Sequence, residues 1–165
     1  MDLSKYKLED LFFTAIKAEI DSKEAYSIMA GITKNAFLRD RFMFLAGEEE
    51  KHRAFLEEEF RRQVPGKSLG LPEVSPVPMP EIKVSGENMP ISELIRQAMA
   101  AEKAAQDFYI NFSKYIIKAN KDFALTLMYF AKMEEGHYEL LKRELESAEQ
   151  FEAYDDFNPG MHLGP

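Results

Sequence analysis

The sequence predicts an all-α fold, a four-helix bundle in which two helical hairpins are joined by a long proline-rich crossover. Apolar residues recur at alternating steps of three and four along four separate segments, which is the pattern of a helix face turned toward a core. A single segment between the second and third of these holds six of the eight prolines and cannot be helical. At 165 residues the chain fits one domain.

The first hairpin is predicted from helices at residues 7–32 and 36–63. The inner face of its first helix carries Leu8, Leu11, Ala15, Glu19, Ser22, Tyr26 and Met29. The inner face of its second helix carries Leu38, Phe42, Leu45, Glu49, His52, Leu56 and Phe60. The periodicity breaks near Thr33, Lys34 and Asn35, and so short a break predicts two antiparallel neighbours.

The second hairpin is predicted from helices at residues 91–118 and 121–149. The inner face of its first helix carries Leu94, Ala98, Glu102, Ala105, Tyr109, Phe112 and Ile116. The inner face of its second helix carries Phe123, Leu127, Phe130, Glu134, His137, Leu141 and Leu145. A turn at residues 119–121 separates them, so this pair is also expected to be antiparallel.

The connector at residues 64–90 is long enough to run the full length of the bundle. A helix of about 28 residues is about 42 Å long, whereas about 27 residues in a polyproline-like conformation can reach about 80 Å. We therefore expect a crossover that leaves the second and third helices parallel. The tail at residues 151–165, which contains Gly160 and two prolines, is expected to be irregular.

Composition restricts the chemistry that the chain can perform. The chain has no cysteine, which excludes disulfides, iron-sulfur clusters and thiolate zinc sites. A formal net charge of -8 argues against nucleic acid as a partner. No apolar run approaches the roughly 20 residues that a membrane-spanning helix needs. We expect a cytoplasmic protein whose metal ligands, if any, are carboxylates and imidazoles.

The pattern Ala-x-x-Glu-x-x-His occurs once in each hairpin, giving Glu49 with His52 and Glu134 with His137. Residues three apart lie on one helix face, so both side chains of each pair can reach one ion. A single Glu-x-x-His can arise by chance, and a lone core histidine is more often structural than a ligand. Two such pairs at equivalent positions favour a metal site.

Each hairpin also carries one inward glutamate on its other helix, Glu19 in the first and Glu102 in the second. The midpoints between these residues and Glu49 or Glu134 fall in or beside the hairpin turns, so the glutamates of each hairpin lie at one level. Four inward carboxylates would repel one another strongly in an apolar interior. Two divalent cations would neutralise them, and oxygen and nitrogen ligands suit iron or manganese.

Three further residues are considered for a role at or near the metal site. Tyr26 and Tyr109, each seven residues after its glutamate, lie on the inner stripe as ordinary core aromatics or as hydrogen-bond donors to the ligands. We treat both tyrosines as candidates for a catalytic role. His162 lies in the tail, where a solvated or packing role is more plausible than ligation.

These motifs resemble the rubrerythrin and ferritin-like di-iron carboxylate family, over about Leu8 to Glu149 apart from the connector. The resemblance implies a ferritin-like bundle, often dimeric, that binds two iron ions. It also implies that Glu49 and Glu134 bridge the ions while Glu19 and Glu102 are terminal, with one histidine on each ion.

The chain departs from rubrerythrins in two respects. It lacks the cysteines of their rubredoxin-like module, so electrons would come from a separate donor such as a rubredoxin-like protein. It also has Ala105 where rubrerythrins tend to carry a further glutamate.

The function that the resemblance favours is reduction of hydrogen peroxide by a non-haem di-iron oxidoreductase, in a homodimer. Two alternatives remain open at this point. One is oxidation and handling of ferrous iron, and the other is activation of dioxygen, with or without an organic substrate. A metal-free helical interaction module would leave the inward carboxylates without a physical reason unless they were protonated.

Overall fold

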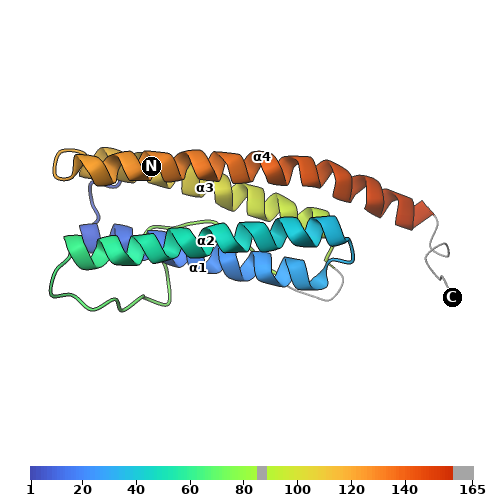
Figure 1. The fold of residues 1–165 in the computed structure, drawn as a ribbon, viewed down its shortest axis with the longest axis horizontal. Coiled ribbons are helices and arrows are strands. Elements are labelled where there is room, and N and C mark those ends of the chain that lie inside the picture. Colours follow the sequence, from blue (N-terminus) through green and yellow to red (C-terminus); the bar gives the residue numbers. More distant parts are fainter. Residues whose placement is uncertain (85–88, 158–165) are drawn as a thin grey trace.

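The computed structural model describes residues 1–84 and 89–157 and contains four long helices in that part of the chain (Figure 1). They are α1 (Leu8–Ile32), α2 (Ala36–Gln63), α3 (Ile91–Ile116) and α4 (Lys121–Phe157). α1 packs mainly against α2, and α3 packs mainly against α4. The predicted all-α bundle of two hairpins is therefore confirmed. None of these helices carries an apolar stretch that could cross a membrane.

Asparagine side chains fix the start of the second helix in each hairpin. The Asn35 side-chain oxygen accepts from the backbone N–H groups of Phe37 at 3.0 Å and Leu38 at 3.2 Å. The Asn120 side-chain oxygen accepts from the Phe123 N–H at 3.0 Å. These bonds satisfy donors that a helix leaves unpaired at its N-terminus, which allows the chain to reverse direction within a few residues.

The connector runs along the bundle, as predicted, and brings the chain from the end of α2 to the opposite end, where α3 begins (Figure 1). Val77 is buried, and its N–H donates to the Thr14 hydroxyl on the first half of α1 at 3.1 Å. Further along, the Lys83 N–H donates to the Gln97 side chain near the start of α3 at 2.8 Å. α2 and α3 are consequently parallel.

The apolar core is divided into two clusters. One cluster lies at the end where α1 and α4 begin, and it is rich in aromatic rings, including those of Phe12, Phe60, Phe112 and Phe123. The other lies at the end where α2 and α3 begin, and it contains Tyr26, Met29, Phe42, Leu94 and Leu141. The polar residues predicted as metal ligands belong to neither cluster, so they interrupt an otherwise apolar interior.

The last helix extends further than the sequence predicted. An irregular tail was expected from residue 151, but α4 continues to Phe157. Residues 150–157 contain neither glycine nor proline, and the next helix-breaking residue in the sequence is Pro159. Gly160 and His162 lie outside the described residues.

The extended part of α4 provides a hydrogen-bond acceptor for the N-terminus of α3. The Glu152 carboxylate accepts a hydrogen bond from the Ser92 backbone N–H at 3.0 Å. The helix cap position is Pro90, which provides no side-chain acceptor. Glu152 therefore supplies from another helix the acceptor and the negative charge that usually come from a local capping residue.

We predict that Glu152→Ala destabilises the protein by about 1 kcal/mol, the usual loss for removal of a helix cap. Chemical denaturation monitored by circular dichroism measures the change. Glu146→Ala is the matched control, because Glu146 is an exposed glutamate on the same helix. Equal stabilities of the two variants would contradict a capping role for Glu152.

Candidate metal centre

The six residues predicted as metal ligands come together halfway along the bundle, one from each of α1 and α3 and two from each of α2 and α4. None is more than 6% exposed. They are Glu19, Glu49, His52, Glu102, Glu134 and His137. The structure thus brings together every predicted ligand and buries all of them.

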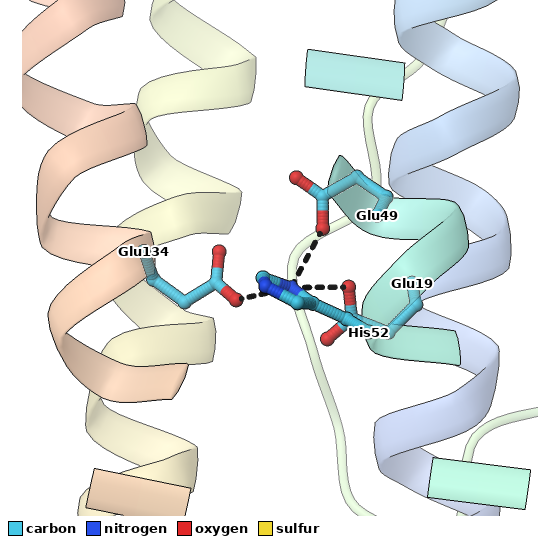
Figure 2. A group of neighbouring side chains, drawn as sticks. All are labelled: Glu19, Glu49, His52 and Glu134. Atoms are coloured by element: carbon cyan, nitrogen blue, oxygen red, sulfur yellow. Dashed lines mark ion pairs between the residues drawn. The ribbon is translucent and has the colours of Figure 1, made fainter. Parts of the chain in front are cut away.

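Two overlapping groups of potential ligand atoms form this centre, and within each group the atoms lie within 4.8 Å of one another. The first group is Glu19, Glu49, His52 and Glu134, whose side chains converge between the two hairpins (Figure 2). The second group is Glu49, Glu102, Glu134 and His137. Glu49 and Glu134 belong to both groups. Glu19 and Glu102 each belong to one group.

Each histidine faces carboxylates from both hairpins. The Nδ1 atom of His52 lies 3.1 Å from an oxygen of Glu134 and 3.5 Å from an oxygen of Glu19. The Nδ1 atom of His137 lies 3.1 Å from an oxygen of Glu49 and 3.5 Å from an oxygen of Glu102. The two imidazole rings are nearly parallel, with centroids 5.8 Å apart.

Several polar atoms of this centre lack a hydrogen-bond partner among the described residues. They are Oε1 of Glu49, Oε1 of Glu134 and both ring nitrogens of His52. The His52 Nδ1 to Glu134 distance suits an ion pair, but those atoms do not form a hydrogen bond. Buried polar atoms are rarely left unpaired without a functional reason. Unpaired carboxylate oxygens and imidazole nitrogens fit a pair of divalent metal ions.

In the metal-free centre, two of the four glutamates hold a proton and the other two are ionised. Burial, together with the charge of Glu49, raises the pKa of Glu19 well above its usual value. Burial, with the charges of Glu49 and Glu134, does the same to the pKa of Glu102. The pKa values of Glu49 and Glu134, the two glutamates shared by both groups, are lowered instead. Burial alone would raise these pKa values, but polar neighbours that include both histidines outweigh it.

The histidines supply the compensating positive charge. Burial lowers the pKa of His52, but contacts with Glu134 and the neighbouring glutamates outweigh it and raise the pKa to about 12. Carboxylates, led by Glu102, likewise raise the pKa of His137 against the effect of burial. Without metal, protons therefore take the place of cations in balancing the two central carboxylates.

The two candidate tyrosines connect the hairpins through hydrogen bonds to ligands. The hydroxyl of Tyr26 on α1 donates to Oε1 of Glu102 on α3, and the hydroxyl of Tyr109 on α3 donates to Oε1 of Glu19 on α1. All four side chains are buried. Burial and the nearby carboxylates raise the pKa of both tyrosines, so each hydroxyl keeps its proton. The sequence left open whether these tyrosines are ordinary core aromatics or hydrogen-bond donors to the ligands, and this geometry agrees with the second interpretation.

An aromatic lid that sequence reasoning did not identify covers the centre on the side of α2 and α4. The Phe130 ring stacks on the His52 ring with centroids 4.4 Å apart, and Phe55 packs on Phe130 at 5.3 Å. Phe130 lies one turn before Glu134 on the inner face of its helix, and this position was the one indication in the sequence that it could lie close to the ligands. Its apolar character made it indistinguishable from other core residues in the sequence.

Comparison with known proteins agrees with this geometry. The rubrerythrin family matches residues 10–145. A solved structure of a hypothetical protein from Pyrococcus furiosus is 32% identical to this chain in sequence. The alignment covers 91% of this chain and 95% of that protein, and the two structures superpose with a TM-score of 0.82. No curated protein matches.

We predict that metal binding releases protons. In the metal-free protein both imidazoles are positively charged, with a proton on each ring nitrogen, and each ring must lose one of these protons to bind an ion. At pH 7, loading with Mn²⁺ should release at least about two protons per chain, and the affinity should increase from about pH 5 to about pH 8. An indicator dye in weakly buffered solution measures the release. Loading without proton release would show that the histidines are neutral before metal binds.

Proposed function

Because the chain belongs to the rubrerythrin family, we propose that it is a non-haem di-iron oxidoreductase that reduces hydrogen peroxide. The observation that carries the proposal is the pair of buried carboxylate and imidazole groups that share Glu49 and Glu134. Sharing of this kind suits two ions held close together. A substrate that accepts two electrons at once matches a centre of two ions that each supply one.

The proposed assignment of ligands follows the two groups. Glu49 and Glu134 would contact both ions, whereas Glu19 with His52 and Glu102 with His137 would each complete the surroundings of one ion. Bound as ferrous iron, the pair supplies two electrons for cleavage of the O–O bond. Manganese would fit the same oxygen and nitrogen ligands.

The tyrosines are placed to manage protons during peroxide reduction, which consumes two protons for each molecule of peroxide. Tyr26 and Tyr109 hold their hydroxyl protons against Glu102 and Glu19 in a buried site. A hydroxyl in this position can relay a proton to a carboxylate oxygen while its own oxygen takes up another, so that the tyrosine stays neutral. Each tyrosine also fixes the orientation of a ligand that belongs to the opposite hairpin.

Two partners belong to the proposal. An external electron donor, such as a rubredoxin-like protein, is needed because this chain has no cysteine with which to hold an electron-transfer iron centre of that kind. A homodimer is supported by large apolar side chains exposed on α2, where Phe37 is 84% exposed, Met43 61% and Phe44 52%. Such exposure is typical of surfaces that bind another protein.

We predict that hydrogen peroxide oxidises the diferrous protein about tenfold or more faster than dioxygen at equal concentration. Peroxide needs only the two electrons that two ferrous ions hold, whereas reduction of dioxygen to water needs four. Anaerobic rapid mixing, with absorbance of the diferric product as the signal, compares the two oxidants directly. Faster oxidation by dioxygen would favour the oxygenase or iron-oxidising function over peroxide reduction.

We predict that Tyr109→Phe still binds two ions but slows peroxide reduction at least about tenfold, because Glu19 loses its buried proton donor. Iron content and single-turnover rate separate these effects. Tyr115→Phe is the matched control, since the Tyr115 hydroxyl donates to a backbone carbonyl, that of Tyr6, at 3.4 Å and not to a candidate ligand. Equal rates for the two variants would remove Tyr109 from the proton route.

A further inference from the structure

A cavity of about 550 Å³ lies between α1, α3 and the connector, outside the metal centre. Its wall combines residues of α1, two alanines of α3 and the connector from Glu73 to Val84. None of the six candidate ligands lines it. The volume falls within the range of about 300–1,000 Å³ that is typical of sites for small organic molecules, and it is far larger than one peroxide molecule requires.

Small side chains line the cavity next to two of the candidate ligands. Ala18 and Ser22 of α1 line the cavity and flank Glu19, and Ala101 and Ala105 of α3 line it and flank Glu102. Ser22 and Ala105 are each three residues beyond their glutamate, and so they lie one turn away on the same side of the helix. The cavity wall that neighbours Glu19 and Glu102 in the sequence is therefore made of small side chains.

The opposite side of the centre is closed by rings. Phe130 and Phe55 cover His52 between α2 and α4, and neither residue could be passed without displacing a packed aromatic side chain. The two hairpins supply equivalent ligands, but they do not cover the centre equally. The cavity lies on the other side, between α1 and α3, where alanines and a serine line it next to Glu19 and Glu102.

The lining of the cavity selects for a neutral organic molecule. Its buried or half-buried apolar residues include Ala25, Met79, Ile82 and Val84. Four exposed carboxylates surround it, those of Asp21, Glu24, Glu73 and Glu81, against the single ammonium of Lys17, which already pairs with Asp21 at 3.2 Å. Such a rim repels anions, and the apolar interior disfavours strongly hydrated cations.

We propose that this cavity binds the organic group of a neutral alkyl hydroperoxide, so that the O–O group reaches the metal centre between Ala18 and Ala105. This inference rests on the proposed peroxide reduction. The hydroperoxide accepts two electrons from the diferrous pair and two protons, its O–O bond breaks, and the products are one alcohol and one water. The external electron donor then returns two electrons to the metal pair.

Binding is tested first on the metal-free protein with 2-phenyl-2-propanol, the alcohol produced from cumene hydroperoxide. Isothermal titration calorimetry should show binding to the wild type that Ala105→Leu or Ala18→Leu weakens at least about tenfold, because leucine fills the passage. Ala46→Leu is the matched control, since Ala46 lines a separate shallow groove between α1 and α2. No binding to the wild type, or equal binding to all variants, overturns the assignment of the cavity.

Reduction is then tested on the diferrous protein with cumene hydroperoxide and hydrogen peroxide. We expect Ala105→Leu to slow oxidation by cumene hydroperoxide at least about tenfold and oxidation by hydrogen peroxide less than about threefold. Circular dichroism and an iron content equal to that of the wild type verify the fold, and Ala18→Leu provides a second variant. If hydrogen peroxide oxidises the wild type but cumene hydroperoxide does not, this inference is wrong and the proposed function stands. If neither oxidises it, the proposed function fails as well.

Discussion

The rest of the structure depends on the burial of four carboxylates and two imidazoles at the centre of an apolar bundle. These six residues are at most 6% exposed, and they interrupt a core that otherwise consists of two apolar clusters. Each hairpin alone would hold only half of the ligands, so the charges balance only when the hairpins meet. Buried ionisable groups are costly unless they are paired. The ion pairs and hydrogen bonds among these groups consequently connect the two hairpins.

The centre has two ways of balancing these charges. In the metal-free protein, Glu19 and Glu102 are neutral because they hold a proton, and the positive charges of the two imidazoles compensate the ionised Glu49 and Glu134. Two divalent cations could replace those protons, because the unpaired oxygens and nitrogens already point toward one another. Either protons or cations would relieve the repulsion among the buried carboxylates.

The equivalent hairpins surround the centre unequally. Rings close the side formed by α2 and α4, whereas small side chains and the crossover cover the side formed by α1 and α3. Ala105, where rubrerythrins tend to carry a further glutamate, lines the cavity on that open side. A departure from the family pattern thus coincides with space next to the metal centre. In the proposed function, the six ligands would hold the metal pair and the covering residues would set which substrate reaches it.

The sequence by itself determined the four helices, apart from the end of α4, and the six candidate ligands that face the interior, because the step of three and four residues fixes which side chains share a helix face. Equal distances from the turns then placed Glu19 with Glu49 and Glu102 with Glu134. Only the tertiary structure decided that Tyr26 donates to Glu102, 76 residues away, and that Val77 docks on Thr14, 63 residues away. It also decided that Glu152 caps α3, that Phe130 covers His52 and that a cavity remains beneath the connector. Periodicity describes each helix alone, whereas these features depend on how separate elements pack against one another in three dimensions.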